Sequence, residues 1–368
     1  MTAQKLTQGV SAVIRGENRI MGMKTTSSKR RKSLIVTAVA VAAAGGVAAA
    51  VIPAFAAGGD RADHAGHAGG GAQGIVSQSG ALSGGAGGTV LAAGLRGANE
   101  VPVADGPAVG DKDGAALQFV KVKGDKVSVA VTWRGTGEPT ALHIHQGAKG
   151  TNGGIKVDFG ALLGRSEGRG KGEAKDRGHR LTGTVTVKDA ALLNALKAEP
   201  SSFYANLHTA EFPGGAVRGQ LHKVTVAEFD FRDALHNFQA SVVKGKQIYQ
   251  CKPAEGGGYA FAQRDVSAVL GGRIAHSFVA PNSGTPQWIA PDGSAVTGAV
   301  ISRTPNGDGN IPELDLKATQ SGKHHGLLAD TAEILRLNTV GGVAPAGSCT
   351  PGAVVGVPYQ ADYVFING

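Results

Sequence analysis

The stretch TALHIHQGAKGTNG, residues 140–153, combines a β-strand pattern with two histidines one residue apart. Side chains alternate between the two faces of a strand, so His143 and His145 share one face, opposite the aliphatic residues that alternate with them. The Gly- and Asn-rich residues that follow predict a turn. This pattern is typical either of an ordinary amphipathic strand or of half of a metal site.

The rest of the chain predicts strands of the same kind. Of its 368 residues 58 are glycine, and only 5% are aromatic. Alternating runs rich in Val, Thr and Ala begin near Thr89 and again near Phe238, with turn pairs such as Gly124-Asp125 between them. We therefore expect an all-β protein with two antiparallel β-sandwich or barrel-like domains. Residues 189–198 predict one short helix in the first domain, ending before Pro200.

The first 56 residues have the features of a signal peptide. A basic cluster at residues 29–32 precedes an uncharged segment, residues 34–56, which closes on Ala54-Phe55-Ala56. A start at Met21 or Met23 would give a more usual leader length. A retained membrane anchor is the alternative, but cleavage is favoured, and after cleavage we expect no membrane span.

Removing the leader changes the charge balance. Residues 1–56 contain 8 Lys and Arg and 1 Glu, a net charge of +7, and the whole chain carries +9, which leaves about +2 for the mature protein. Most of the positive charge therefore lies in the leader, so the high net charge of the chain does not indicate a nucleic-acid partner, and we expect none. Residues 57–88 are rich in Gly, Ala and Ser and predict a flexible linker.

The only two cysteines, Cys251 and Cys349, lie outside the leader. An exported chain meets an oxidising environment, so we expect them to form a disulfide. Free thiols that bind a metal are the alternative, although no CxxC spacing supports it.

Four motifs occur between residues 89 and 226 in the order known from one family: LRGANEVP (95–102), HIHQGAKGTNG (143–153), PSSFYANLHT (200–209) and FPGGAVRGQL (212–221). This region resembles a CHRD domain, the module repeated in chordin and found singly in many exported bacterial proteins. The resemblance implies an exported β-domain and, since chordin is a binding protein, a binding role.

Residues 239–368 resemble a family of unknown function that occurs in exported bacterial and fungal proteins. The resemblance rests on GKQIYQC (245–251), PQWIAPDGSAVTG (286–298), TVGGVAPAGSC (339–349) and YQADYVF (359–365). Residues 227–238 would then form a linker between the domains. Neither resemblance implies a reaction, so we expect a non-enzymatic binding or structural protein that is secreted, extracellular or associated with the cell wall or envelope.

The two-residue period also predicts a polar face on the CHRD-like strands. Phe203, Ala205 and Leu207 would face the core, which places Tyr204, Asn206 and His208 opposite, and Arg218 and Gln220 fall on the corresponding face of the next strand. One interpretation is a recognition surface for a protein, cell-wall or glycan partner, made by Tyr204, Asn206, Arg218 and Gln220. Another is that these side chains only hold turns and loops through hydrogen bonds.

The third interpretation is a copper or zinc site made by His143, His145 and His208, since imidazole suits both ions. HIH followed by a Gly- and Asn-rich turn, with a later GGxxRG strand, resembles the layout of copper/zinc superoxide dismutase and implies a dismutase-like metal protein as the alternative function. His179 is the remaining candidate for that family's bridging histidine. Apart from such a site we predict no cofactor and no catalytic residues.

Overall fold

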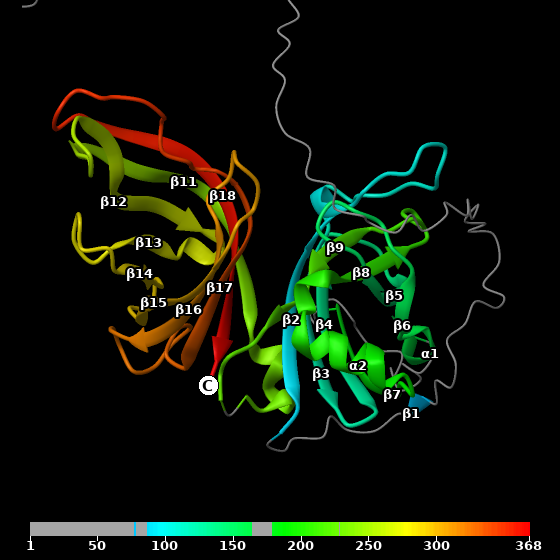
Figure 1. Ribbon diagram of the computed structural model, residues 1–368. Coiled ribbons are helices and arrows are strands. Elements are labelled where there is room, and N and C mark those ends of the chain that lie inside the picture. The colour runs from blue at the N-terminus through cyan, green and yellow to red at the C-terminus, as the bar shows by residue number, and fades with distance from the viewer. Residues whose placement is uncertain (1–76, 79–86, 164–178, 228) are drawn as a thin grey trace, which may run out of the picture. The chain divides into compact units, whose positions relative to one another are not determined.

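The structure is a computed structural model that describes residues 77–78, 87–163, 179–227 and 229–368 (Figure 1). These residues belong to one compact unit of the chain. Their regular structure is almost entirely antiparallel β-sheet, which confirms the predicted all-β class. Across these ranges, no helix is both long enough and apolar enough to span a membrane.

The first part of the described chain is a curled sheet of ten strands (Figure 1). Their order is β1-β7-β4-β3-β2-β9-β8-β5-β6, and β10 pairs with β2. The hairpin between β3 and β4 turns at Gly124, whose φ of 58° lies in the left-handed region that such a two-residue turn requires. The strands are β1 (Ser77–Gln78), β2 (Thr89–Arg96), β3 (Ala115–Lys123), β4 (Lys126–Arg134), β5 (Pro139–Gln146), β6 (Ile155–Asp158), β7 (His179–Thr186), β8 (Phe203–Thr209), β9 (Val217–Gln220) and β10 (His222–Lys223).

The predicted helix is α2 (Ala190–Ala198). The carboxylate of Asp189 caps it by accepting a hydrogen bond from the backbone N–H of Leu192 at 2.9 Å. Leu193 and Leu196 turn from the helix into the apolar core of the curled sheet. The remaining helices are single turns or short 3-10 segments: α1 (Gly160–Leu163), η1 (Gly97–Asn99), η2 (Pro200–Ser202), η3 (Phe231–His236) and η4 (Gly271–Arg273).

The second part of the described chain is a closed barrel of eight strands, joined in sequence order from β11 to β18. The sequence indicated a sandwich or a barrel, and the pairing of the first strand with the last decides for the barrel. The strands are β11 (Phe238–Pro253), β12 (Tyr259–Leu270), β13 (Ala275–Phe278), β14 (Pro286–Ile289), β15 (Ala295–Thr304), β16 (Glu313–Gln320), β17 (Thr331–Gly341) and β18 (Val354–Asn367).

Cys251 on β11 and Cys349, in the loop before β18, form the predicted disulfide, with their Cα atoms 5.8 Å apart. The bond joins two segments 98 residues apart in the sequence. Because closing so long a loop restricts the unfolded chain, the bond contributes about 4–5 kcal/mol to stability in the chain-entropy model.

The segment predicted as a linker, residues 227–238, is packed where the structure describes it. Phe231 and Ala234, both on η3, are buried. The Phe229 ring stacks on the Phe119 ring of β3 with centroids 5.4 Å apart. Apolar contacts therefore hold this part of the chain.

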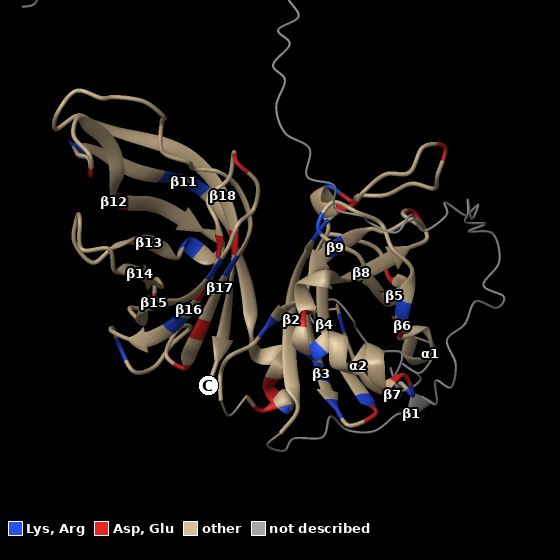
Figure 2. Cartoon of the chain, in the orientation of Figure 1, with Lys and Arg blue, Asp and Glu red and all other residues tan. Residues whose placement is uncertain are grey.

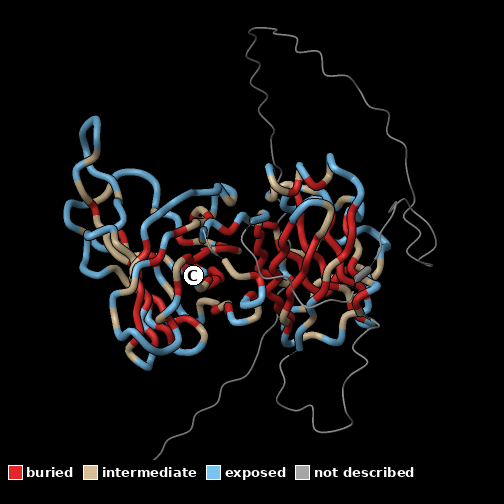
Figure 3. The backbone as a smooth tube through the Cα atoms, turned by 90° about the horizontal axis from the view of Figure 1, so that it is seen from below, coloured by how far each residue is buried: buried red, intermediate tan, exposed pale blue. Residues whose placement is uncertain are grey.

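Buried residues follow the middles of the strands, and exposed residues follow the turns (Figure 3). Lys and Arg are interspersed with Asp and Glu over the described strands (Figure 2).

Gln118 is an exception inside the apolar core of the curled sheet. It lies on β3 between Ala93 and Val131 of the neighbouring strands and is fully buried. Neither its amide nitrogen nor its amide oxygen has a hydrogen-bond partner in the described parts of the chain. Such a group destabilises the folded state because it gives up its bonds to water.

We expect Gln118→Met to raise the free energy of unfolding by about 1–3 kcal/mol, since it keeps the volume and removes the unpartnered amide. Urea titration of both proteins measures this. Gln360→Met, at an exposed position, is the control and should change little. A less stable Gln118→Met variant would show that the amide is bonded in solution.

His276 gives the barrel a defined sensitivity to acid. Its ring stacks on Trp288 with centroids 4.4 Å apart, and its Nδ1–H donates to the carbonyl of Gln287 at 2.9 Å. Burial lowers the pKa of His276 to about 3. In the unfolded chain the His276 imidazole is protonated below about pH 6.5, whereas in the folded chain it stays neutral down to about pH 3. The free energy of unfolding therefore falls as the pH drops from about 6.5 toward 3.

Unfolding free energies of the wild type and of His276→Phe, measured from pH 7 to pH 4, test this sensitivity. The wild type should lose more stability over that interval than the variant, by up to about 3–4 kcal/mol. His324→Phe, at an exposed position, should keep the wild-type slope. Equal slopes for wild type and His276→Phe would contradict the low pKa of His276.

Candidate metal centre

The three predicted ligand histidines lie on two neighbouring strands. His143 and His145 are on β5, His208 is on β8, and the two strands pair so that Ala141 lies opposite His208 and His143 opposite Asn206. The ring centroids are 5.4 Å apart for His143 and His145, 5.0 Å for His143 and His208, and 6.2 Å for His145 and His208. The structure therefore places all three rings on one face of the sheet.

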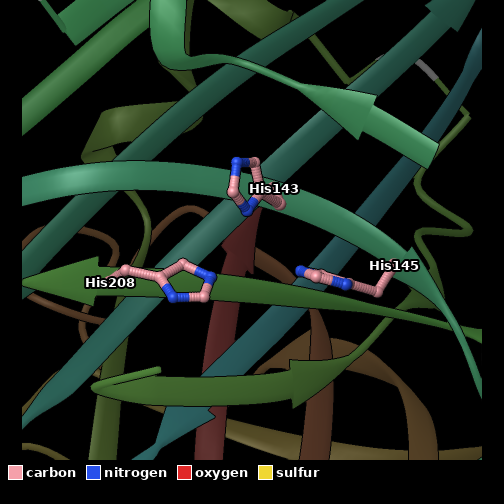
Figure 4. Close-up of side chains that lie close together, drawn as sticks. All are labelled: His143, His145 and His208. Atoms are coloured by element: carbon pink, nitrogen blue, oxygen red, sulfur yellow. The ribbon is translucent and has the colours of Figure 1, made fainter. Parts of the chain in front are cut away.

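One ring nitrogen of each histidine points into a shared space (Figure 4). The candidate ligand atoms of the three residues all lie within 4.8 Å of one another. His143 and His145 are buried, and His208 is half-buried. The arrangement is compact, and two of its three rings are buried.

The other ring nitrogens face oxygen acceptors. His145 Nδ1 lies 3.0 Å from the carbonyl oxygen of Gly153, and His208 Nδ1 lies 3.0 Å from that of Pro213. A carbonyl oxygen can only accept, so each of these nitrogens carries the proton and Nε2 keeps its lone pair. His143 Nε2 lies 3.5 Å from an Asp158 carboxylate oxygen, which leaves Nδ1 as the lone-pair nitrogen of that ring.

The inward nitrogens of the two buried rings have no internal partner. His143 Nδ1 and His145 Nε2 are buried and make no hydrogen bond to any part of the chain that the structure describes. Burial lowers the pKa of His145 to about 3, with the neighbouring His143, His208 and Arg218 acting in the same direction and the bond to Gly153 opposing them. The His145 ring is therefore neutral at physiological pH, the form that binds metal ions.

Three of the four side chains predicted as a binding face, those of Tyr204, Arg218 and Gln220, bond to the chain's own loop, residues 147–153. Tyr204, Asn206 and Arg218 are buried. The Arg218 guanidinium donates to the carbonyls of Ala148 and Thr151 and to Asn152, at 3.2, 2.6 and 3.1 Å, and the Gln220 amide donates to the carbonyls of Gly147 and Ser201 at 2.7 and 2.8 Å. The recognition surface stays a prediction, and in this structure these groups fasten the loop beside the histidines.

Glu100, which the sequence analysis did not single out, lies next to this polar layer. Its Oε2 is 3.5 Å from the Asn206 amide nitrogen. Burial raises the pKa of Glu100 to about 8, although the Arg218 cation and the Asn206 hydrogen bond both act to lower it. The motif LRGANEVP contains Glu100, but nothing in that motif alone indicates that the carboxyl is buried.

His179, the candidate bridging histidine, does not join the cluster. It begins β7, its Nδ1 lies 2.8 Å from a carboxylate oxygen of Glu138, and its ring lies beside Trp133 with centroids 5.6 Å apart. Among the residues with described positions, the cluster of possible metal ligands consists of His143, His145 and His208 alone.

Comparison with protein families agrees with the two resemblances seen in the motifs. Residues 91–221 match the model of the CHRD domain, and residues 267–367 match that of a protein of unknown function (DUF3455). Comparison with curated proteins and with solved structures found no match. The histidine cluster thus lies in the first matched region and the disulfide-closed barrel contains the second: the chain carries a CHRD domain followed by a DUF3455 domain.

Proposed function

We propose that the CHRD domain binds one divalent transition-metal ion through His143, His145 and His208, and that it binds Cu(II) more tightly than Zn(II). The observation that carries the proposal is the convergence of three imidazole nitrogens within 4.8 Å. Nitrogen ligands of one ion, at about 2.0–2.1 Å from it, lie at most about 4.2 Å apart. Small rotations of the rings would bring the set to that spacing.

The hydrogen bonds on the outer side of the rings support the proposal. Histidines that bind metal donate their other N–H to a carbonyl or carboxylate, which fixes the tautomer and the ring orientation. Gly153 and Pro213 provide carbonyl acceptors for His145 and His208, and Asp158 provides a carboxylate beside His143. Each ring is therefore held with its ligand nitrogen directed inward.

The unpartnered inward nitrogens argue against a cluster that only stabilises the fold. A buried polar atom without a partner destabilises the folded chain by about 1–3 kcal/mol. His143 Nδ1 and His145 Nε2 are two such atoms side by side, with no bond to each other or to other described residues. A bound ion satisfies both at once.

The donor set favours copper. Three imidazoles without a thiolate suit Cu(II), Zn(II) and Ni(II), and the order of divalent affinities places Cu(II) first. A dismutase-like reaction is not part of this proposal, because His179 pairs with Glu138 away from the cluster. The proposed role is non-enzymatic metal binding.

We also propose that the protein is exported and works outside the cell or at its envelope. The basic cluster at residues 29–32, the uncharged segment to residue 56 and the small-x-small ending support export. The disulfide between Cys251 and Cys349 fits an oxidising compartment.

Metal analysis of the purified protein tests the proposed centre. We expect one Cu(II) per chain after loading and gel filtration, and an affinity more than about 100-fold lower for His143→Ala, since losing a ligand exceeds the 10–100-fold effect of losing an outer hydrogen bond. At a free Cu(II) concentration 100 times Kd, the ion should stabilise the wild type by about 2.7 kcal/mol.

The control is His324→Ala, an exposed histidine in the barrel domain, which should retain full binding. A wild type that binds no Cu(II) or Zn(II), or a His143→Ala variant that binds as the wild type does, rejects the proposed centre.

Export has its own test. Expressed in a bacterium with the whole leader, the protein should appear outside the cytoplasm with Ala57 as its first residue, because cleavage would follow Ala56. Mass spectrometry of the intact protein measures this, and a thiol titration of the same sample should find no free cysteine. Recovery of the uncleaved chain with two free thiols would contradict export.

A further inference from the structure

A three-layer stack connects the proposed metal centre to a buried arginine. The His145 ring lies flat on the Tyr204 ring, with centroids 4.9 Å apart and planes inclined by 4°. On Tyr204 lies the guanidinium of Arg218, whose Cζ is 3.4 Å from the ring centroid. Tyr204 is directly opposite His145 on the paired strand, so the stack follows from the register of β5 and β8.

Arg218 also holds the loop that bonds to the outer side of His145. Its guanidinium donates to the carbonyls of Ala148 and Thr151. Two residues after Thr151, the carbonyl of Gly153 accepts the Nδ1–H of His145. One guanidinium thus supports the His145 ring twice, on its face through Tyr204 and at its edge through the loop.

The guanidinium of Arg218 is a positive charge that is buried away from water. The residue is 1% exposed, and no carboxylate of the described chain lies within ion-pair distance of it. Burying a cation in this way is costly unless hydrogen bonds compensate for the lost water. The hydrogen bonds of Arg218 to the loop carbonyls and its stacking on Tyr204 compensate for that cost, and a methionine would leave those carbonyls without donors.

We infer that Arg218 is a positioning residue of the metal centre and orients His145 through Tyr204 and the 147–153 loop. The inference rests on the proposed metal binding and extends it to a residue that does not touch the ion. It needs an arginine in particular, because only a planar guanidinium can lie flat on a ring and donate in several directions in its own plane. A lysine would keep the charge without either contact.

The experiment compares Cu(II) binding in the full-length wild type, Arg218→Met, Arg218→Lys and Tyr204→Leu. Tyr204→Leu removes the stacked ring and the hydrogen bonds of its hydroxyl with Gly153, but none of the hydrogen bonds of Arg218 to the loop. It therefore also covers the case in which Arg218→Met does not fold. The matched control is Arg336→Met in the barrel domain, because Arg336 also donates to a backbone carbonyl, that of Pro312 at 3.2 and 2.7 Å.

Two measurements separate positioning from a general loss of stability. Competition with a chromophoric chelator gives the Cu(II) affinity of chains shown by circular dichroism to be folded. Electron paramagnetic resonance of the Cu(II) form shows how many nitrogens couple to the ion. We expect coupling to fall from three nitrogens to two in all three test variants as His145 leaves the ion, and affinity to fall by more than about 100-fold, because a lost ligand exceeds the 10–100-fold effect of an outer-sphere partner.

The inference is overturned if folded Arg218→Met and Tyr204→Leu bind Cu(II) with wild-type affinity and three coupled nitrogens. It is also overturned if Arg218→Lys keeps the wild-type Cu(II) affinity and three coupled nitrogens, because a positive charge alone would then suffice. An equal loss in Arg336→Met would assign the effect to stability. A wild type that binds no Cu(II) rejects the proposed metal binding itself, a result distinct from all of these.

Discussion

The pairing of β5 with β8 is the constraint on which the candidate centre depends. A slip of one residue would turn every side chain of a strand to the other face. Here the slip is opposed by Leu142 and Ile144, which are fully buried in the same apolar core as Leu207. By holding the register, that core fixes His143 and His145 on the opposite face. Burial of apolar area is thus what brings the polar cluster together.

The loop at residues 147–153 bonds to side chains on the polar face of this sheet, and that face is buried where most such faces are exposed. One face of an antiparallel sheet is commonly open to water, but here Tyr204, Asn206 and Arg218 are buried on it. The loop bonds to Tyr204 and Arg218, and its own carbonyls need donors once they are out of water. Arg218 and Gln220 supply those donors. The same short segment also offers the carbonyl of Gly153 that orients His145.

Local patterns were enough to predict the all-β class, the helix that begins after Asp189, the disulfide and the common face of His143 and His145. Each depends on periodicity, on a capping residue or on compartment chemistry, which act over short distances or on the chain as a whole. Closure of the barrel could not be predicted, because it depends on β11 meeting β18 across more than a hundred residues. The position of His208 beside His143 and His145 likewise depends on β8 pairing with β5. The burial of Arg218 depends on how the loop at residues 147–153 folds back. None of these has a local sequence signature.

Unpartnered buried polar atoms have two different meanings in this chain, and geometry separates them. Gln118 is alone among aliphatic side chains, so its amide has nothing to share with a neighbour and only destabilises the core. The unpartnered nitrogens of His143 and His145 face one another across a space that His208 also borders, and their outer nitrogens are directed to oxygen atoms. A single cation can satisfy several lone pairs that converge, and it can do nothing for an isolated amide. Convergence, more than burial or the residue type, is therefore what distinguishes the histidine cluster as a binding site.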